Sequence, residues 1–202
     1  SVIDGVLVYD ARRRIGEKLA KHPVKADLVS PVPDSGTAFA TGFADASGIP
    51  YKEGLLKNRH VGRTFIMPAQ SLRENAVRMK LNPVRRHISG KSVILVDDSI
   101  VRGTTSLHIV DMVREFGAAE VHMRIGSTPI VAPCYFGVDL PTREELIANG
   151  RTVEEIRDMI HATSLEYIST EDLVESFGIP SEDLCMACSC GAYPLEIPNE
   201  SC

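Results

Sequence analysis

The segment that most constrains the fold runs from Ser92 to Val96 and reads Ser-Val-Ile-Leu-Val. Four consecutive apolar residues are typical of a strand that is buried on both of its faces. Two carboxylates follow at once, Asp97 and Asp98, and a helical pattern of apolar residues resumes after Gly103. A buried strand that leads through a turn into a helix is the repeating unit of a parallel α/β sheet.

The same alternation of strands and helices extends over the first two thirds of the chain. Apolar residues recur with strand or helix periodicity, and turn residues separate the segments. The predicted strands are residues 26–33, 49–56, 92–96 and 120–127. The predicted helices are residues 6–21, 36–48, 71–82 and 104–117. This order predicts an α/β fold with an open, mostly parallel sheet flanked by helices.

The pattern changes after residue 128, where short helical segments replace the alternation. Thr142 and Thr152 are each followed three residues later by a glutamate, which is the pattern of a helix-capping box. We therefore expect an α/β core at residues 1–130 and a C-terminal helical annex at residues 131–202.

Composition narrows the classes of function. The 202 residues carry a formal net charge of −5, which argues against a dedicated nucleic-acid-binding protein. No apolar run approaches the roughly 18 residues of a membrane span, and no basic-then-apolar leader is visible after Ser1. These features predict a cytoplasmic protein without a membrane or nucleic-acid partner.

Asp97 and Asp98 stand where a parallel sheet binds its ligands, just outside the carboxyl end of a strand. Adjacent side chains of a strand point in opposite directions, so the two carboxylates serve different partners. Gly103 lets the backbone approach a ligand, and Thr104 and Thr105 offer hydroxyl and N–H groups that suit a phosphate. The carboxylates suit sugar hydroxyls, or a Mg²⁺ ion that carries another phosphate. The alternative is an acidic strand end that only caps a helix.

Two further segments have the same character. A turn that leads from a strand into a helix would form a second phosphate-binding site; it consists of Asp34, Ser35, Gly36 and Thr37. The loop at residues 57–70 carries three cations, namely Lys57, Arg59 and Arg63. Each segment alone is also compatible with an ordinary turn or a solvated basic loop. Together with residues 97–105, they predict a substrate with a 5′-phosphate, a diol and a pyrophosphate.

The run from Val93 to Thr105 resembles the 5-phosphoribosyl-1-pyrophosphate (PRPP) binding motif of type I phosphoribosyltransferases. Five segments narrow the resemblance to the glutamine PRPP amidotransferases, and in chain order they read PVPDSGT, LLKNRHVGRTFIMP, VILVDDSIVRGTTS, APCYFGVDLPTREELIA and LCMACSCGAYP. The resemblance covers nearly the whole chain, but only the C-terminal phosphoribosyltransferase half of that family. The family's N-terminal glutaminase domain has no counterpart in the sequence.

The resemblance implies a role for each segment. The 5′-phosphate would be held by Ser99, Ile100, Val101, Arg102, Gly103, Thr104 and Thr105. Asp97 and Asp98 would bind the ribose hydroxyls and, with Ser35, position Mg²⁺. The pyrophosphate would lie against Asp34, Ser35, Gly36 and Thr37. Residues 57–70 would form a lid whose catalytic cations are Lys57, Arg59 and Arg63, and nucleotides such as AMP and GMP would compete for the site with Lys57 as a contact.

The implied reaction is displacement of pyrophosphate from PRPP by ammonia, which gives 5-phosphoribosylamine for de novo purine biosynthesis. In the resembled family a glutaminase domain delivers the ammonia, so this chain alone would use ammonia rather than glutamine. The intact enzyme is expected to be a homo-oligomer. Two other functions stay open: a PRPP-binding regulatory module, and a salvage phosphoribosyltransferase that acts on a free base.

The cysteines form a separate pattern. An odd count of five in a chain without a leader is a poor disulfide framework. Cys185 and Cys188 form a C-x-x-C pair, whose two thiolates can reach one metal, whether zinc or iron; buried or free thiols are the alternative. The resemblance implies a [4Fe–4S] cluster held by Cys134, Cys185 and Cys188, with the fourth ligand upstream of Ser1. Such a cluster would be lost or labile in this chain.

Overall fold

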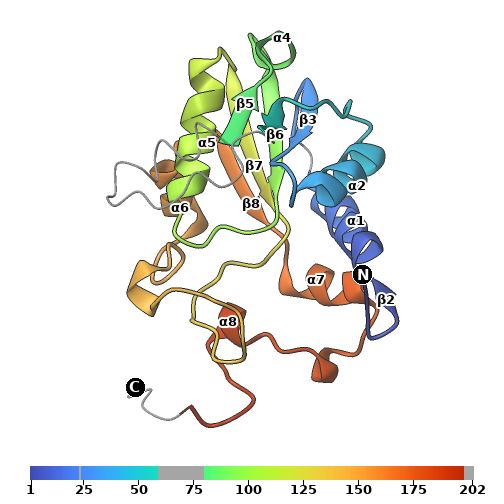
Figure 1. The fold of residues 1–202 in the computed structure, drawn as a ribbon, viewed down its shortest axis with the longest axis vertical. Helices are drawn as coiled ribbons and strands as arrows, with labels where there is room; N and C mark the ends of the chain where they lie inside the picture. Colours follow the sequence, from blue (N-terminus) through green and yellow to red (C-terminus); the bar gives the residue numbers. More distant parts are fainter. Residues whose placement is uncertain (23, 59–79, 198–202) are drawn as a thin grey trace.

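A parallel sheet of four strands lies at the centre of the computed structural model, which describes residues 1–22, 24–58 and 80–197 (Figure 1). Its strands are β3 (Leu28–Pro31), β6 (Ser92–Asp97), β7 (Glu120–Ile125) and β8 (Ser164–Tyr167). They are hydrogen-bonded in the order β3-β6-β7-β8, and all three pairings are parallel. The predicted α/β fold with a mostly parallel sheet is confirmed.

Helices cover both faces of this sheet. The main ones are α1 (Val8–Leu19), α2 (Thr37–Ser47), α5 (Thr104–Glu115) and α6 (Val153–Met159). Helices α1 and α2 lie on one side, and α5 and α6 lie on the other (Figure 1). This arrangement explains why the strand is apolar from Val93 to Val96, since both of its faces are covered.

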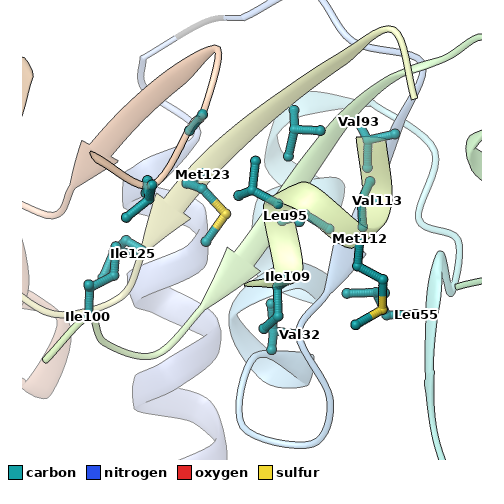
Figure 2. Packing of buried hydrophobic residues seen from close by; sticks show 14 of the residues in the cluster. Val32, Leu55, Val93, Leu95, Ile100, Ile109, Met112, Val113, Met123 and Ile125 are labelled. Atoms are coloured by element: carbon teal, nitrogen blue, oxygen red, sulfur yellow. The ribbon is translucent and has the colours of Figure 1, made fainter. Parts of the chain in front are cut away.

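Alternate residues of β6 belong to two different cores. Val93 and Leu95 join the cluster that contains Ile109 of α5, whereas Ile94 and Val96 join the cluster beneath α1 and α2. All four strand side chains are fully buried. Figure 2 shows the α5 side of this packing. Burial of each such side chain stabilises the fold by roughly 1.5–3 kcal/mol. The four residues from Val93 to Val96 therefore pack β6 against helices on both faces of the sheet.

Helix α2 contacts α1 almost backbone to backbone. A Cβ atom added at Gly42 would lie 2.0 Å from the carbonyl oxygen of Arg13 in α1, so only glycine permits this separation. The helix ends at Gly48, whose φ of 72° is the left-handed conformation common after a helix C-terminus. The small residues of the predicted helix at 36–48 therefore serve close packing, as expected, with α1 as the main partner.

Shorter elements complete the described part of the chain. They are β1 (Val2–Ile3), β2 (Val6–Leu7), β4 (Leu55–Lys57), β5 (Leu81–Pro83), α4 (Arg85–Ile88), η1 (Arg143–Glu145), α7 (Thr170–Phe177), η2 (Ser181–Asp183) and α8 (Ala187–Cys190). Strands β4 and β5 pair antiparallel beside the main sheet. Within the ranges that the structure describes, no helix is long and apolar enough to cross a membrane.

The sequence analysis missed β8, which lies in the segment expected to be helical and yet joins the core sheet. Its pairing places Ser164 beside His122 and Glu166 beside Arg124. The hydroxyl of Ser164 is 2.8 Å from Nδ1 of His122. The strand has only four residues, and the alternation of Ser164 and Glu166 with the core-packed Leu165 and Tyr167 is too short to stand out from the helical segments around it.

The predicted segments on either side of the loop at 57–70 also differ from the structure. Of the strand expected at 49–56, only Leu55 and Leu56 lie in β4, and Tyr51 forms an isolated bridge with Val29. The helix expected at 71–82 ends in a region where residues 81–83 form β5 instead. Residues 71–79 lie outside the described residues.

The two predicted capping boxes have different outcomes. At the start of α6, the Thr152 hydroxyl accepts a hydrogen bond from the backbone N–H of Glu155, and the Glu155 carboxylate accepts one from the N–H of Thr152. At Thr142 the side chain makes no capping bond, and only the short 3₁₀ helix η1 follows. The first box is confirmed, and the second was wrong because the segment turns after one helical turn.

Candidate functional site

Two strand–turn–helix units place the predicted residues at one edge of the sheet. Strand β3 leads through residues 32–36 into α2, and β6 leads through residues 98–103 into α5. Pro31 pairs with Val96 in parallel register, so both turns lie at the carboxyl ends of neighbouring strands, where α/β folds bind ligands. A cavity of about 960 Å³ opens there. Its lining includes Ser35, Lys57, Asp97, Asp98, Ser99, Arg102, Gly103, Thr104, Thr105 and Glu145.

Asp97 joins the two turns. Its Oδ1 accepts a hydrogen bond of 3.2 Å from the hydroxyl of Ser35 and one of 2.9 Å from the backbone N–H of Asp98. Ser35 belongs to the turn after β3 and Asp97 ends β6, so a side-chain contact closes the site across neighbouring strands. The structure thus brings together two of the three residues predicted to position Mg²⁺, and the third, Asp98, is adjacent.

Asp97 is buried, with 7 % of the residue exposed. Burial raises its pKa to about 7, and the neighbouring charge of Asp98 adds to this shift. The hydrogen bonds from Asp98 N–H and Ser35 lower the pKa and only partly oppose the increase. A buried acid of this kind strongly favours a positive charge beside it, because such a charge would stabilise its ionised form.

The turn at 98–103 forms a concave rim at the start of α5. Gly103 has a φ of +79°, a backbone conformation that side-chain-bearing residues rarely adopt. The hydroxyls of Thr104 and Thr105 are on exposed residues in the first turn of α5, where N–H groups of a helix lack intrahelical partners. This geometry suits a phosphate. Ile100 differs from its neighbours, because its side chain is buried in the core and only its backbone can contact a ligand.

The annex supplies two residues that the sequence analysis did not place at the site. The guanidinium Nε of Arg102 donates a hydrogen bond of 2.6 Å to Oε2 of Glu145. The backbone N–H of Ile147 donates a bond of 2.9 Å to the carbonyl of Val101. A Cβ atom at Gly103 would lie 2.2 Å from Cδ1 of Ile147, so this side chain packs directly on the turn. No local pattern could indicate these contacts, since 43 residues separate Arg102 from Glu145.

The turn at 32–36 is held to β6 by its backbone. The N–H of Val32 donates to the carbonyl of Val96 at 2.9 Å, and a Cβ at Gly36 would lie 2.1 Å from that same oxygen. A cis peptide joins Pro33 to Asp34. The carboxylate of Asp34 is exposed and forms an ion pair with Lys57, which comes from β4. Lys57 therefore lies beside the predicted pyrophosphate turn.

The other two predicted lid cations, Arg59 and Arg63, lie outside the described residues, as does most of the predicted lid at 57–70. Their catalytic role stays a prediction.

The oxygen atoms at the strand ends fit a magnesium ion. Mg²⁺ prefers carboxylate and hydroxyl or water oxygens and often binds through one or two carboxylates and substrate phosphates. Asp97, Asp98 and Ser35 supply such oxygens beside a cavity with a phosphate-binding rim. Their donor set therefore matches the predicted ion, with substrate oxygens needed to complete it.

The predicted cysteine ligands lie on segments that are close together. The N–H of Val131 donates to the carbonyl of Cys188 at 2.8 Å, and the hydroxyl of Tyr193 donates to the carbonyl of Pro133 at 2.9 Å. Cys134, Cys185 and Cys188 nevertheless remain free thiols. Among the described residues, no three His, Cys, Asp or Glu side chains gather as a metal-binding group. The thiols as arranged here do not form a ligand set for a cluster.

Curated relatives match the chain along nearly its whole length. The chain is 59% identical over 201 residues to the amidophosphoribosyltransferase of Methanocaldococcus jannaschii, and 54% identical over 206 residues to that of Bacillus subtilis. This chain is related to the amidophosphoribosyltransferases. The alignments cover 99% and 100% of the chain but 42% and 43% of the two relatives, so the chain spans less than half the length of the amidophosphoribosyltransferases it matches. No family model matches the chain.

Solved amidotransferase structures share the fold in detail. A structure described as the allosteric regulatory enzyme of purine biosynthesis matches with a TM-score of 0.90 and 52% identity, covering 99% of this chain and 44% of that one. The glutamine PRPP amidotransferase of B. subtilis, complexed with ADP and GMP, matches with a TM-score of 0.89 and 52% identity, covering 100% of this chain and 46% of that one. Both the sequence and the fold therefore agree with the resemblance to glutamine PRPP amidotransferases that the five motifs indicated.

Proposed function

We propose that the cavity at the carboxyl ends of β3 and β6 binds PRPP, and that this chain is the phosphoribosyl-transferring, C-terminal half of an amidophosphoribosyltransferase. The observation that carries the proposal is the contact between Ser35 and Asp97. It joins two turns that each suit a phosphate, and it places a buried carboxyl between them. This arrangement of turn, carboxyl and turn fits a ribose that carries a phosphate group at each end.

Each part of the site has a defined task in this proposal. The turn at 99–105 holds the 5′-phosphate through backbone N–H groups and the hydroxyls of Thr104 and Thr105. Asp97 and Asp98 accept hydrogen bonds from the ribose hydroxyls. The turn at 34–37 and Lys57 lie against the pyrophosphate. When bound by Ser35, Asp97 and Asp98, Mg²⁺ would supply positive charge that favours departure of pyrophosphate.

The proposed reaction breaks the bond between the anomeric carbon and pyrophosphate, which leaves with the bonding electrons. Ammonia forms the new C–N bond and then loses a proton to give 5-phosphoribosylamine. Charge resembling an oxocarbenium ion develops on the sugar as the leaving group departs, as in glycoside cleavage. Carboxylates beside the ribose stabilise that charge, while Lys57 and the predicted cations Arg59 and Arg63 stabilise the leaving group. Ammonia arrives as a neutral nucleophile, so no general base is needed to activate it.

Comparison of nucleophiles tests the proposal. Pyrophosphate release from PRPP should depend on Mg²⁺ and ammonia, and glutamine should not replace ammonia with this chain alone. The Asp97→Asn variant should abolish most of the release. Turnover with a free purine or pyrimidine base in place of ammonia would favour a salvage enzyme. Binding of PRPP without any turnover would favour a regulatory module.

Purine nucleotides such as AMP and GMP are the proposed inhibitors of this site. The B. subtilis structure contains ADP and GMP, and Lys57 lines the cavity here. An intact enzyme of the relatives' length would be a homo-oligomer that receives ammonia from its glutaminase domain. Competition of GMP with PRPP, and loss of that competition in Lys57→Gln, test the first part of this proposal.

A [4Fe–4S] cluster is proposed only for the longer polypeptide. The close approach of residues 131–133 to residues 188–193 supports it, although the thiols of this chain do not form the ligand set. Cys134, Cys185 and Cys188 would supply three ligands and a cysteine upstream of Ser1 the fourth. Iron and sulfide analysis after anaerobic reconstitution of a polypeptide of the relatives' length tests the cluster, and absence of both elements would exclude it.

A further inference from the structure

Glu145 is an acid at the rim of a site built for anions. Its carboxylate lines the cavity and binds Arg102, which belongs to the turn assigned to the 5′-phosphate. The two side chains are about half exposed, at 51 % for Glu145 and 53 % for Arg102, so both can rearrange toward a ligand. Neither position is explained by packing, because neither side chain is part of the buried core.

The backbone around Glu145 is firmly attached to the phosphate turn. Leu146 is fully buried and Ile147 is nearly so. The N–H of Ile147 binds the carbonyl of Val101, one residue before Arg102, and its side chain packs on Gly103. The backbone of Glu145 is therefore held beside the turn, while its side chain stays free to rearrange.

This placement opposes the binding of a phosphate. A guanidinium bound to a carboxylate attracts an incoming anion less than a free one does, because the carboxylate repels the phosphate. To bind the phosphate, Arg102 has to exchange the Glu145 carboxylate for phosphate oxygens, which form equally good paired bonds with a guanidinium. Arg102 thus has two alternative anionic partners.

We propose that Glu145 is an intramolecular competitor for the sugar 5′-phosphate, which Arg102 binds by releasing Glu145. This inference rests on the proposed function, because it takes the turn at 99–105 as the 5′-phosphate site. The competition lowers affinity for phosphorylated sugars and eases product release. Glu145 is a residue that tunes affinity, and it takes no part in the chemical step.

Titration calorimetry in the presence of Mg²⁺ tests the competition with two probes, ribose 5-phosphate and inorganic pyrophosphate. The variant Glu145→Gln should bind ribose 5-phosphate about two- to fivefold more tightly than the wild type, which is the range expected for one exposed ion pair. Its affinity for pyrophosphate should not change. Arg102→Gln should weaken ribose 5-phosphate binding, and in that background Glu145→Gln should have a smaller effect.

Glu144→Gln is the matched control, because it removes the same charge from the neighbouring residue, which does not line the cavity. It should leave both affinities unchanged. Glu145→Ser provides a second route to the same effect if the glutamine variant is unstable.

The possible outcomes separate this inference from the proposed function. Unchanged or weaker ribose 5-phosphate binding in both Glu145 variants overturns the competition. An equal gain in Glu144→Gln, or an equal gain for pyrophosphate, overturns it too, because either would indicate a general charge effect. If the wild type binds neither ribose 5-phosphate nor PRPP, the proposed function fails together with the inference.

Discussion

The two turns of the site share a topology and differ in how the rest of the chain supports them. The turn at 98–103 follows the buried Asp97 and is covered by the annex through Ile147. The turn at 32–36 carries the exposed Asp34, whose ion pair with Lys57 faces solvent. The backbone of the first turn is held in place by the annex, whereas the side chains of the second turn face solvent. This difference fits the proposed roles, in which the first turn would anchor the sugar phosphate and the second would bind the leaving group.

The largest expected effect is on catalysis, and it distinguishes Asp97 in the first turn's strand from Asp34 in the second turn. Asp97→Asn should reduce turnover of PRPP with ammonia by roughly 100-fold or more, the usual scale for loss of one charged group that stabilises a transition state. Asp98→Asn should also reduce turnover strongly. Asp34→Asn should have a smaller effect, because its carboxylate is exposed and paired with Lys57. Initial rates of pyrophosphate release measure all three. Equal losses for Asp34 and Asp97 would remove the distinction between the turns.

A second test compares the glycines of the two turns. In Gly36→Ala, the new methyl group would meet the backbone carbonyl of Val96 at 2.1 Å, which cannot move without shifting β6. In Gly103→Ala, it would meet the end of the Ile147 side chain, which can rotate, although the φ of +79° adds strain. We expect destabilisation of about 3 kcal/mol or more for Gly36→Ala and about 1–2 kcal/mol for Gly103→Ala. Denaturant unfolding measures both, and the reverse order would contradict this account.

A third test uses pH. The pKa of Asp97 is raised from 3.8 to about 7 in the fold, mainly by burial. The folded state therefore binds a proton more tightly than the unfolded state, and this contribution to stability is complete below pH 3.8 and is lost as the pH rises toward 7. With a metal chelator present, Asp97→Asn should gain stability relative to the wild type over that interval.

Asp34→Asn is the control for the pH experiment, because its side chain is 66 % exposed. Its thermal midpoint should follow that of the wild type across the same pH range. A constant difference between Asp97→Asn and the wild type from pH 4 to 8 would show that burial does not control the charge of Asp97. Addition of Mg²⁺ should reduce the advantage of the variant, because the cation stabilises the ionised acid.

The smallest expected effect concerns Lys57. Its ion pair with Asp34 is exposed, so Lys57→Gln should change the free energy of unfolding by no more than about 0.5 kcal/mol. It should raise the KM for PRPP and weaken inhibition by GMP. A large fall in thermal midpoint with unchanged kinetics would show that β4 and its lysine are structural.

Much of the fold could be predicted because local patterns and tertiary environment agree. The apolar run at 93–96 lies in a strand, and its two faces are covered as such a run requires. The turn residues Asp34 and Gly103 precede helices as expected. β8 was missed because its four residues give too short an alternation to distinguish a strand, although Leu165 and Tyr167 pack against the core. Its pairing with β7 identifies it as a strand of the main sheet.

The sequence by itself determined the strand–turn–helix units β3–α2 and β6–α5, the two phosphate-type turns and the residues that stand in them. Those features depend on periodicity, on side-chain chemistry and on glycine, which are local properties of the chain. The tertiary structure alone decided that Ser35 touches Asp97, that burial changes the charge of that acid, and that Glu145 and Ile147 reach the phosphate turn. Contacts between residues 43 and 62 positions apart arise from packing against the whole sheet, and local sequence carries no record of them.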